Sequence, residues 1–232
     1  MDRPFRIICL LFPRVTQLDL TGPVQVFSLA PDVAIDLVWR DMEPVPTDSG
    51  FSILPTRTFA DAPPADLLMV PGGNGAFDLM DDEAALAFIR DQARYARYVS
   101  SVCTGAFVLG AAGLLVGKRA TTHWASRPLL ELFGAIPREG RVVWDGALVT
   151  GGGVTSGIDF GLEIIATLWD EATARRAQLM IEYDPHPPFD AGAPGRPGTD
   201  PAVVDQIMES NQRIRGPLVD AAAARLRGHD AG

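Results

Sequence analysis

The chain has 232 residues, of which 47% are hydrophobic and 21% are charged, and its formal net charge is −9 at pH 7. These values exclude a disordered or fibrous protein and suit one α/β domain with a large core. The acidic balance argues against nucleic acid and against an anionic membrane surface as partners, because both select basic proteins.

The cysteine content and the N-terminal segment predict a protein of the reducing cytoplasm. The chain has two cysteines, Cys9 and Cys103, so a disulfide framework is not expected. The segment MDRPFRIICLLF is not followed by a small-residue cleavage site, so it does not resemble a secretory signal. No apolar run approaches the ~20 residues of a membrane-spanning helix.

The first half of the chain alternates apolar runs with segments of helical spacing. Strands are predicted at 6–12, 34–40, 66–73 and 98–102, with a short hairpin at 50–59. Helices are predicted at 81–97 and 104–115, and a further one from about Pro23 after a loop that contains Asp19.

The second half continues the alternation. A strand is predicted to begin within 119–124, a capped helix at 126–134, a hairpin with an Asp-Gly turn at 141–153, and helices at 154–170 and 171–183. Residues 184–201 are too rich in proline and glycine for regular structure. Two C-terminal helices are predicted after them, divided near Gly216 and Pro217.

This order of elements predicts βαβ units, which form a mostly parallel sheet with helices on both faces. Since neither a linker nor an internal repeat is evident, residues 1–232 are predicted to form one domain. Ligands of open α/β sheets bind at the carboxyl ends of the strands. Three features fall at such ends: Asp19, the turn with Gly72 and Gly73, and Cys103.

Cys103 follows the strand at 98–102 directly and precedes a helix, which is the pattern of a nucleophile elbow. A helix N-terminus beside the sulfur would favour the thiolate. The backbone N–H of Thr104 and a second donor from the turn at Gly72, Gly73 and Asn74 would form an oxyanion hole. The competing interpretation is a small buried residue, which is also the prediction for Cys9 within its strand.

The acid–base partner of Cys103 is not settled by the residues alone. His123, His186 and His229 show no clear Cys/His pairing, and residue 104 is threonine. Asp19 lies between two leucines and is expected to be buried. It either shares a proton with the thiol or caps the following helix, and both interpretations stay open.

Three consecutive glycines precede the helix that begins near Val154. We expect Gly152, Gly153 and Val154 to form a wall of the pocket, because glycine permits close approach of the backbone. A backbone carbonyl of this turn is a candidate acceptor for the Cys103 thiol, and the turn is a weaker candidate for a hinge.

Five segments carry a resemblance to a known family: LDLTGPVQVF, LLMVPGG, SVCTGAFVLGAAGLLVGKRATTHW, VTGGGVTSGIDFGLEI and EYDPHPPFDAGAPG. With these segments, which are spread over most of the chain, the chain resembles the ThiJ/PfpI superfamily of class I glutamine amidotransferase-like proteins. The resemblance implies a flavodoxin-like α/β sandwich built around a reactive cysteine.

Within this superfamily the chain is most similar to isocyanide hydratases, which convert R–N≡C and water to an N-substituted formamide without a metal or cofactor. The resemblance implies that Cys103 is the nucleophile, Asp19 its acidic partner and Thr104 the neighbouring threonine. It also implies a homodimer, with residues 184–228 as elements that cap the pocket or form the dimer contact.

Other members of the superfamily suggest different functions. Protease-like and chaperone-type members have glutamate near the position of Asp19, and some have histidine where this chain has Thr104, so a peptidase or glyoxalase activity is disfavoured. AraC-type regulators share the cysteine motif but add a DNA-binding region, for which no room follows residue 195. A protein that senses ligands or stress through oxidation of Cys103, and a cysteine-dependent amidase or glyoxalase, remain as alternatives.

Overall fold

The computed structural model describes residues 3–229, without the side chain of His229. Its centre is a seven-stranded sheet with the order β10-β11-β7-β6-β1-β2-β5. The strands are β1 (Phe5–Leu10), β2 (Val33–Trp39), β5 (Arg57–Thr58), β6 (Leu67–Val70), β7 (Tyr98–Val102), β10 (Val142–Asp145) and β11 (Leu148–Gly151). All neighbours run parallel except β10 and β11, which confirms the predicted mostly parallel sheet and the Asp-Gly hairpin.

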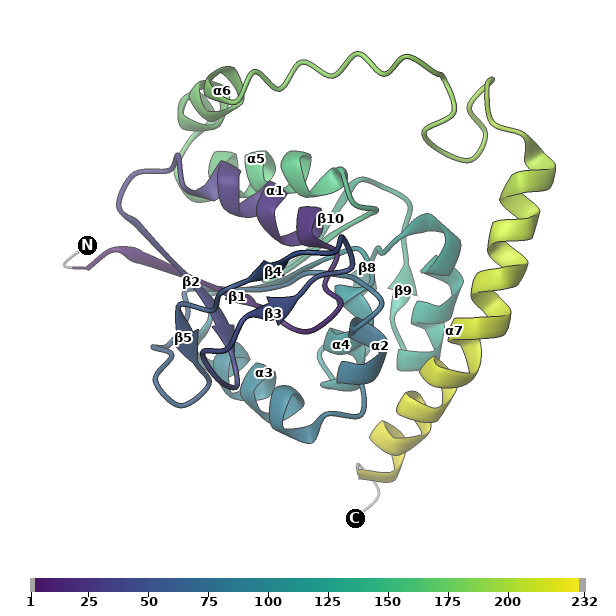
Figure 1. Cartoon of the computed structure of the whole chain (residues 1–232), viewed down its shortest axis with the longest axis horizontal. Helices are drawn as coiled ribbons and strands as arrows, with labels where there is room; N and C mark the ends of the chain where they lie inside the picture. Colours follow the sequence, from purple (N-terminus) through teal and green to yellow (C-terminus); the bar gives the residue numbers. More distant parts are fainter. Residues whose placement is uncertain (1–2, 230–232) are drawn as a thin grey trace.

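Helices cover both faces of the sheet (Figure 1). On one face lie α1 (Gln17–Phe27) and α5 (Ser156–Leu168), with α6 (Glu171–Met180) packed on α5. On the other lie α2 (Ala76–Leu79), α3 (Glu83–Tyr95) and α4 (Gly105–Ala111). Because both faces are covered, β6 and the segment Ile7–Leu10 of β1 are continuous apolar runs. Cys9 is fully buried in β1, where desolvation raises its thiol pKa, so the structural interpretation of Cys9 is confirmed.

The predicted hairpin at 50–59 is wrong. Strand β4 (Ser52–Ile53) pairs with the earlier β3 (Val45–Pro46), whereas β5 joins the edge of the main sheet beside β2. Pro55 lies between β4 and β5 and offers no backbone N–H. The strand expected within 119–124 is only β8 (Arg119–Ala120), which pairs with β9 (Ile136–Pro137). A 3₁₀ helix, η1 (Trp124–Phe133), follows where a helix was predicted.

The predicted loop before Pro23 is also wrong, because α1 already begins at Gln17 and contains Pro23. The reason is tertiary packing between α1 and α5. A Cβ atom on Gly157 of α5 would lie 3.0 Å from the Pro23 ring, and one on Gly161 would lie 2.9 Å from Val26. The two helices thus approach closely, and their packing offsets the hydrogen bond that Pro23 cannot make. As a result, Asp19 lies in the first helical turn.

The C-terminal region forms a single helix, α7 (Pro201–His229), and not the two helices that were predicted. An internal proline costs a helix about 3 kcal/mol. Here Gly216 and Val219, on either side of Pro217, are buried, and α7 packs on η1, α4 and α2. This packing keeps the helix continuous through Pro217.

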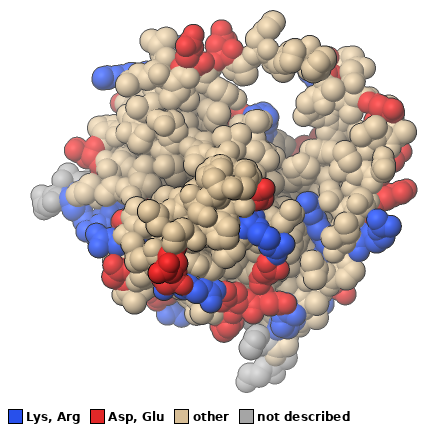
Figure 2. All heavy atoms as spheres, viewed as in Figure 1, with Lys and Arg blue, Asp and Glu red and all other residues tan. Residues whose placement is uncertain are grey.

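Residues 184–200 contain neither helix nor strand, as predicted, and cross from α6 to α7 (Figure 1). The segment is mostly exposed, and Figure 2 shows open space between it and the rest of the molecule. Within residues 3–229, no helix is both long and apolar enough to span a membrane.

Candidate active site

Cys103 occupies a sharp turn between β7 and α4. Its φ angle is +54°, a left-handed conformation that is unfavourable for a residue other than glycine. The turn is held by the Cys103 backbone N–H, which donates to the carbonyls of Gly151 and Gly152 at 3.1 and 2.9 Å. The Thr122 hydroxyl donates to the Cys103 carbonyl at 2.6 Å. Such enforced strain is typical of functional positions, and it agrees with the nucleophile elbow expected from the sequence.

Small residues make this turn possible. A Cβ atom on Gly105 would lie 2.1 Å from the carbonyl oxygen of Val70, so only glycine fits at the start of α4. The turn after β6 is equally close. A Cβ atom on Gly72 would lie 2.5 Å from Oδ2 of Asp19 and 2.8 Å from Cβ of Cys103. The bare backbone of Gly72 therefore brings the Asp19 carboxyl and the Cys103 side chain together.

Asp19 does not cap α1. The N-cap residue is Thr16, and Asp19 is fully buried in the first turn. Among the described residues, neither carboxyl oxygen has a partner at ordinary hydrogen-bond geometry. The polar groups that act on the carboxyl are the Cys103 thiol and the Gly72 N–H. These contacts are looser than ordinary hydrogen bonds, and the capping interpretation of Asp19 is set aside.

Burial dominates the protonation of this pair. It raises the pKa of Asp19 to about 7, assisted by the charge of Asp48 and opposed by the Cys103 thiol and the Gly72 N–H. Burial and the neighbouring Asp19 also raise the pKa of Cys103 well above its ordinary value, whereas the Thr104 N–H and the charge of Arg215 lower it. Because the two groups interact, their protons titrate as a pair.

Thr104 is buried, and its side chain is fully engaged. Its Oγ1 accepts from the Gly73 N–H at 2.9 Å and donates to the Gly73 carbonyl at 3.0 Å. The Gly73 N–H is therefore not a free oxyanion donor. The Thr104 N–H lies beside the Cys103 sulfur, where it lowers the pKa of the thiol. Asn74 lines the same cavity and is the remaining member of the turn that can supply a second donor.

The cavity at Cys103 has a volume of about 210 Å³. Five of the residues that line it were predicted for the site: Cys103, Thr104, Gly73, Asn74 and Val154. Three others were not predicted for it: Thr16, His123 and Arg215. The closest contacts place Asp19 and Gly72 directly behind Cys103. The structure thus brings together residues from four predicted segments.

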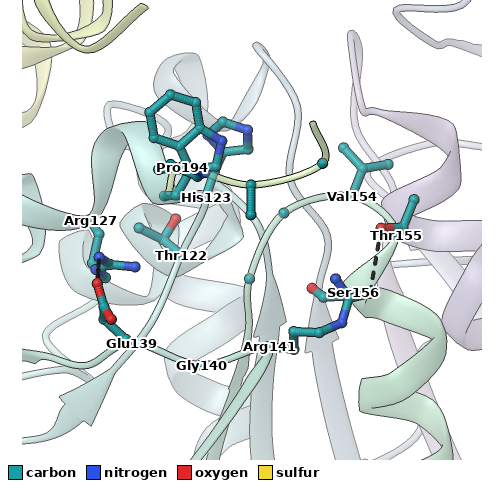
Figure 3. A pocket seen from close by; sticks show the side chains of 15 residues that line it. Thr122, His123, Arg127, Glu139, Gly140, Arg141, Val154, Thr155, Ser156 and Pro194 are labelled. Carbon is teal, nitrogen blue, oxygen red and sulfur yellow. Dashed lines mark hydrogen bonds and ion pairs between the residues drawn. The ribbon is translucent and has the colours of Figure 1, made fainter. Parts of the chain in front are cut away.

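A larger cavity of about 510 Å³ adjoins the first and shares His123 and Val154 with it (Figure 3). Gly152 and Gly153 form part of its wall, as expected. Residues 192–194 of the long exposed segment reach its rim. The second cavity therefore offers space beyond the cysteine for a substituent of the substrate.

His123 belongs to both cavities but does not pair with Cys103. Its Nδ1 accepts a hydrogen bond from the backbone N–H of Ala125 at 3.3 Å, so the neutral ring carries its proton on Nε2. Burial and the charge of Arg215 lower the pKa of His123 and favour this neutral form. His186 is exposed in the segment at 184–200. No Cys/His dyad forms among the described residues, and no three of their His, Cys, Asp and Glu side chains cluster as metal ligands.

Sequence analysis did not predict Arg215 as part of the site. This residue is on α7, on the side of the helix that faces the cavity at Cys103. No motif marks it, although it lies on the less exposed side of α7, at helical spacing from Asn211, Val219 and Ala222. The sequence suggested that a carbonyl of the glycine turn accepts a hydrogen bond from the Cys103 thiol. In the structure, the donor to the Gly152 carbonyl is instead the Cys103 backbone N–H.

The sequence pattern of the DJ-1/PfpI family matches residues 5–167, which include β1, β6, β7 and the turn at Cys103. The chain belongs to the DJ-1/PfpI family. This membership agrees with the flavodoxin-like sandwich and the resemblance drawn from the five sequence segments.

Two DJ-1/PfpI relatives are similar over nearly the whole chain. An isonitrile hydratase of Pseudomonas putida is 53% identical over 220 residues, which cover 94% of this chain and 96% of that protein. The crystal structure of a ThiJ/PfpI family protein from Pseudomonas syringae has a TM-score of 0.90 and 42% identity, and the match covers 95% of this chain and 90% of that chain.

A third relative represents the regulators that share the family domain. A helix-turn-helix-type transcriptional regulator of Rhizobium meliloti is 31% identical over 191 residues, covering 79% of this chain but 59% of the regulator. The similarity to the isonitrile hydratase extends over far more of the relative's length.

Proposed function

We propose that this protein hydrates isocyanides, converting R–N≡C and water to R–NH–CHO. The observation that carries the proposal is the buried carboxyl of Asp19 beside the strained Cys103, with Gly72 between them, at the end of a cavity of about 210 Å³. The 53% identity to an isonitrile hydratase over 94% of the chain supports the same substrate class.

The chemistry begins with the thiol–carboxyl pair. Because the pKa of Asp19 is about 7, the pair near neutral pH can hold a single proton and one negative charge. These pKa shifts favour a Cys103 thiol beside an Asp19 carboxylate, and transfer of the thiol proton to Asp19 gives the reactive form, in which Cys103 is a thiolate. The thiolate adds to the terminal carbon of the isocyanide, and Asp19 gives its proton to that carbon. The product is a thioimidate, Cys–S–CH=N–R, beside an Asp19 carboxylate.

Hydrolysis of the thioimidate returns the pair to its first state. The Asp19 carboxylate takes a proton from water as the oxygen bonds to carbon, and the nitrogen then receives that proton. The tetrahedral adduct expels the Cys103 thiolate, its hydroxyl proton passes to Asp19, and the formamide leaves. The N–H groups of Thr104 and Asn74 are the proposed donors to the oxygen of this adduct.

No step of this scheme needs a metal or an organic cofactor, so we propose cofactor-independent catalysis by the cysteine. Overnight dialysis against a chelator should leave the turnover unchanged. A loss of turnover that added metal restores would contradict this part of the proposal.

Oxidation sensing is the less favoured function for Cys103. A redox-sensing cysteine typically has a low pKa and an exposed sulfur. Cys103 is only 6% exposed, and burial raises its pKa. These properties suit a thiol that is activated by a neighbouring carboxyl within a closed site.

The decisive experiment measures formamide production from a simple aryl isocyanide by NMR or HPLC under anaerobic, reducing conditions. The wild-type protein should turn over the isocyanide, and Cys103→Ala should not. Cys9→Ala is the matched control, because it removes the other thiol outside the site and should retain activity. Near-normal turnover by Cys103→Ala would refute the proposal.

We also propose that the protein is a cytoplasmic homodimer in which α7 and residues 184–200 are contact elements of one domain. Four large apolar side chains are exposed along α7, at Val203, Ile207, Ile214 and Leu218. Their spacing forms a helical stripe, which a second copy of the chain would cover. The mass from light scattering should be that of two chains, and Ile207→Glu should shift it towards one.

A further inference from the structure

Arg215 is held in place at the wall of the cavity at Cys103. It is half-buried, and one guanidinium nitrogen donates to Oγ of Ser126 at 2.8 Å. The guanidinium carbon lies 5.2 Å from the centre of the Phe77 ring, in a cation–π arrangement. Phe77 itself packs on Phe107 of the helix that follows Cys103, with ring centres 5.6 Å apart. Arg215 is therefore a positioned cation and not a freely moving surface charge.

In the part of the chain that the structure describes, no carboxylate forms an ion pair with Arg215, and the nearby charge that acts on its pKa is that of Cys103. The two arginines of the adjoining cavity are paired, Arg127 with Glu139 and Arg141 with Asp159 (Figure 3 shows the first pair). Arg215 forms no ion pair with a described residue, and Ser126 is its only hydrogen-bond acceptor there. Burial lowers its pKa, but a guanidinium remains charged at neutral pH.

A partly buried cation is favourable only where an anion or several polar groups face it. The other polar groups at the cavity are the neutral His123, Thr16, Asn74 and Thr104, together with the Cys103 thiol. Several N–H donors of Arg215 thus remain available beside a space for a small molecule. The geometry of a guanidinium matches a carboxylate, which it can bind through two parallel hydrogen bonds.

We infer that Arg215 binds a carboxylate on the substituent of the substrate, so that the preferred substrates are small isocyanides that carry an acidic group. This inference rests on the proposed hydratase function. Arg215 and Cys103 line the same cavity. A substrate whose carboxylate is bound by Arg215 would therefore have its isocyano carbon in the space that Cys103 faces. Arg215 lines the cavity of about 210 Å³ and not the adjoining cavity of about 510 Å³, so the carboxylate and the isocyano group would lie close together in the substrate.

The test compares isocyanoacetate with its methyl ester, which differ in charge at one end of the molecule. The kcat/KM for each is measured with the wild-type protein, Arg215→Gln, Arg215→Lys and Arg213→Gln. Arg213 is an exposed residue of the same helix, so Arg213→Gln makes the same change of net charge outside the cavity. Circular dichroism establishes that each variant is folded.

The ratio of kcat/KM for isocyanoacetate to that for the ester should fall by about 10-fold or more in Arg215→Gln, as expected for the loss of a charge-assisted hydrogen bond. Arg215→Lys should restore part of the ratio because it keeps the charge, and Arg213→Gln should leave the ratio unchanged. An equal fall for both substrates would show that Arg215 acts on the thiolate instead, and would overturn the inference. So would an unchanged ratio.

The failure of the proposed function would look different, because the wild-type protein would then hydrate neither the acid nor the ester. That outcome removes both the hydratase function and the inference. Hydration of the ester together with an unaltered ratio in Arg215→Gln removes only the inference. Competition by N-formylglycine, the expected product, gives a second readout, since its inhibition constant should rise in Arg215→Gln more than that of N-formylglycine methyl ester.

Discussion

The carboxyl of Asp19 and the side chain of Cys103 both lie directly beside the backbone of Gly72. A Cβ atom on Gly72 would lie 2.5 Å from Asp19 Oδ2 and 2.8 Å from Cys103 Cβ. The backbone N–H of Thr16 donates to the Gly72 carbonyl at 3.0 Å, which ties the start of α1 to this turn. Three separate segments, which contain Asp19, Gly72 and Cys103, thus form this arrangement. Substitutions in each segment can test it.

Substitution of Asp19 by asparagine should abolish proton transfer and keep the shape of the side chain. We expect kcat to fall about 100-fold or more, which is the usual contribution of a positioned acid–base group. Asp48→Asn is the control, since Asp48 is exposed and its charge acts on the pKa of Asp19 from outside the site. Steady-state turnover of an aryl isocyanide measures both. An unchanged kcat in Asp19→Asn would reduce Asp19 to a structural role.

The pH profile should follow the titration of the pair. The form with one proton and one negative charge appears as pH rises through the Asp19 pKa of about 7. We therefore expect kcat/KM to increase through about pH 7 to a plateau, without a fall until the higher pKa of Cys103 is reached. A profile that decreases between pH 6 and 8 would contradict the assignment of the reactive form (about one unit on either side of the midpoint).

Stability should depend on pH in the opposite direction. The folded-state pKa of Asp19 is raised from 3.8 to about 7, so the native state keeps a proton that the unfolded chain releases. The stabilisation from this protonated group is fully present below the unfolded pKa and is lost as pH rises towards 7. The free energy of unfolding of Asp19→Asn should therefore increase relative to wild type by about 2–4 kcal/mol between pH 4 and pH 7.5. Urea denaturation at several pH values measures the difference, and a pH-independent difference would contradict burial as the cause.

Gly72→Ala should damage the site through sterics alone. The added methyl group would clash with the Asp19 carboxyl and with the backbone nitrogen of Thr104, at 2.7 Å. We expect a loss of about 1–3 kcal/mol of stability and a fall of kcat/KM of at least about 10-fold. Gly228→Ala on α7 is the matched control, because no described atom outside the neighbouring backbone of α7 lies within 4 Å of the added Cβ. The melting temperature and the turnover of Gly228→Ala should be close to those of the wild type.

Thr104→Val should separate the shape of Thr104 from its hydroxyl group. The variant loses both hydrogen bonds with Gly73 and leaves the buried Gly73 N–H without a partner, whereas the Gly73 carbonyl keeps the Ala76 N–H as a donor at 3.2 Å. The expected cost is about 1–3 kcal/mol of unfolding free energy, together with a lower kcat as the turn at 72–74 shifts. Thr104→Ser keeps the hydroxyl group and should retain most of the unfolding free energy and most of kcat. Equal behaviour of the two variants would show that the hydroxyl is not what holds the turn.

The local pattern of the sequence was sufficient for the parallel sheet and for the position of Cys103. A continuous apolar run such as Leu67–Val70 predicts a buried strand, and the small residues after Val102 predict a tight strand-to-helix turn. These signals are local because strand burial and turn geometry depend on neighbouring residues. The same holds for the Asp-Gly hairpin between β10 and β11, which the structure confirms.

Only the tertiary structure decided which distant residues complete the site. Local propensity predicted a loop around Asp19 and a helix break at Pro217, yet packing of α1 on α5 and of α7 on η1 overrode both prolines. Asp19 became the partner of Cys103 through contacts at Gly72, and Arg215 reached the cavity because α7 folds back over η1 and α4. The burial that sets the Asp19 pKa belongs to the assembled core, since no neighbour in the sequence can remove water from a side chain to that extent.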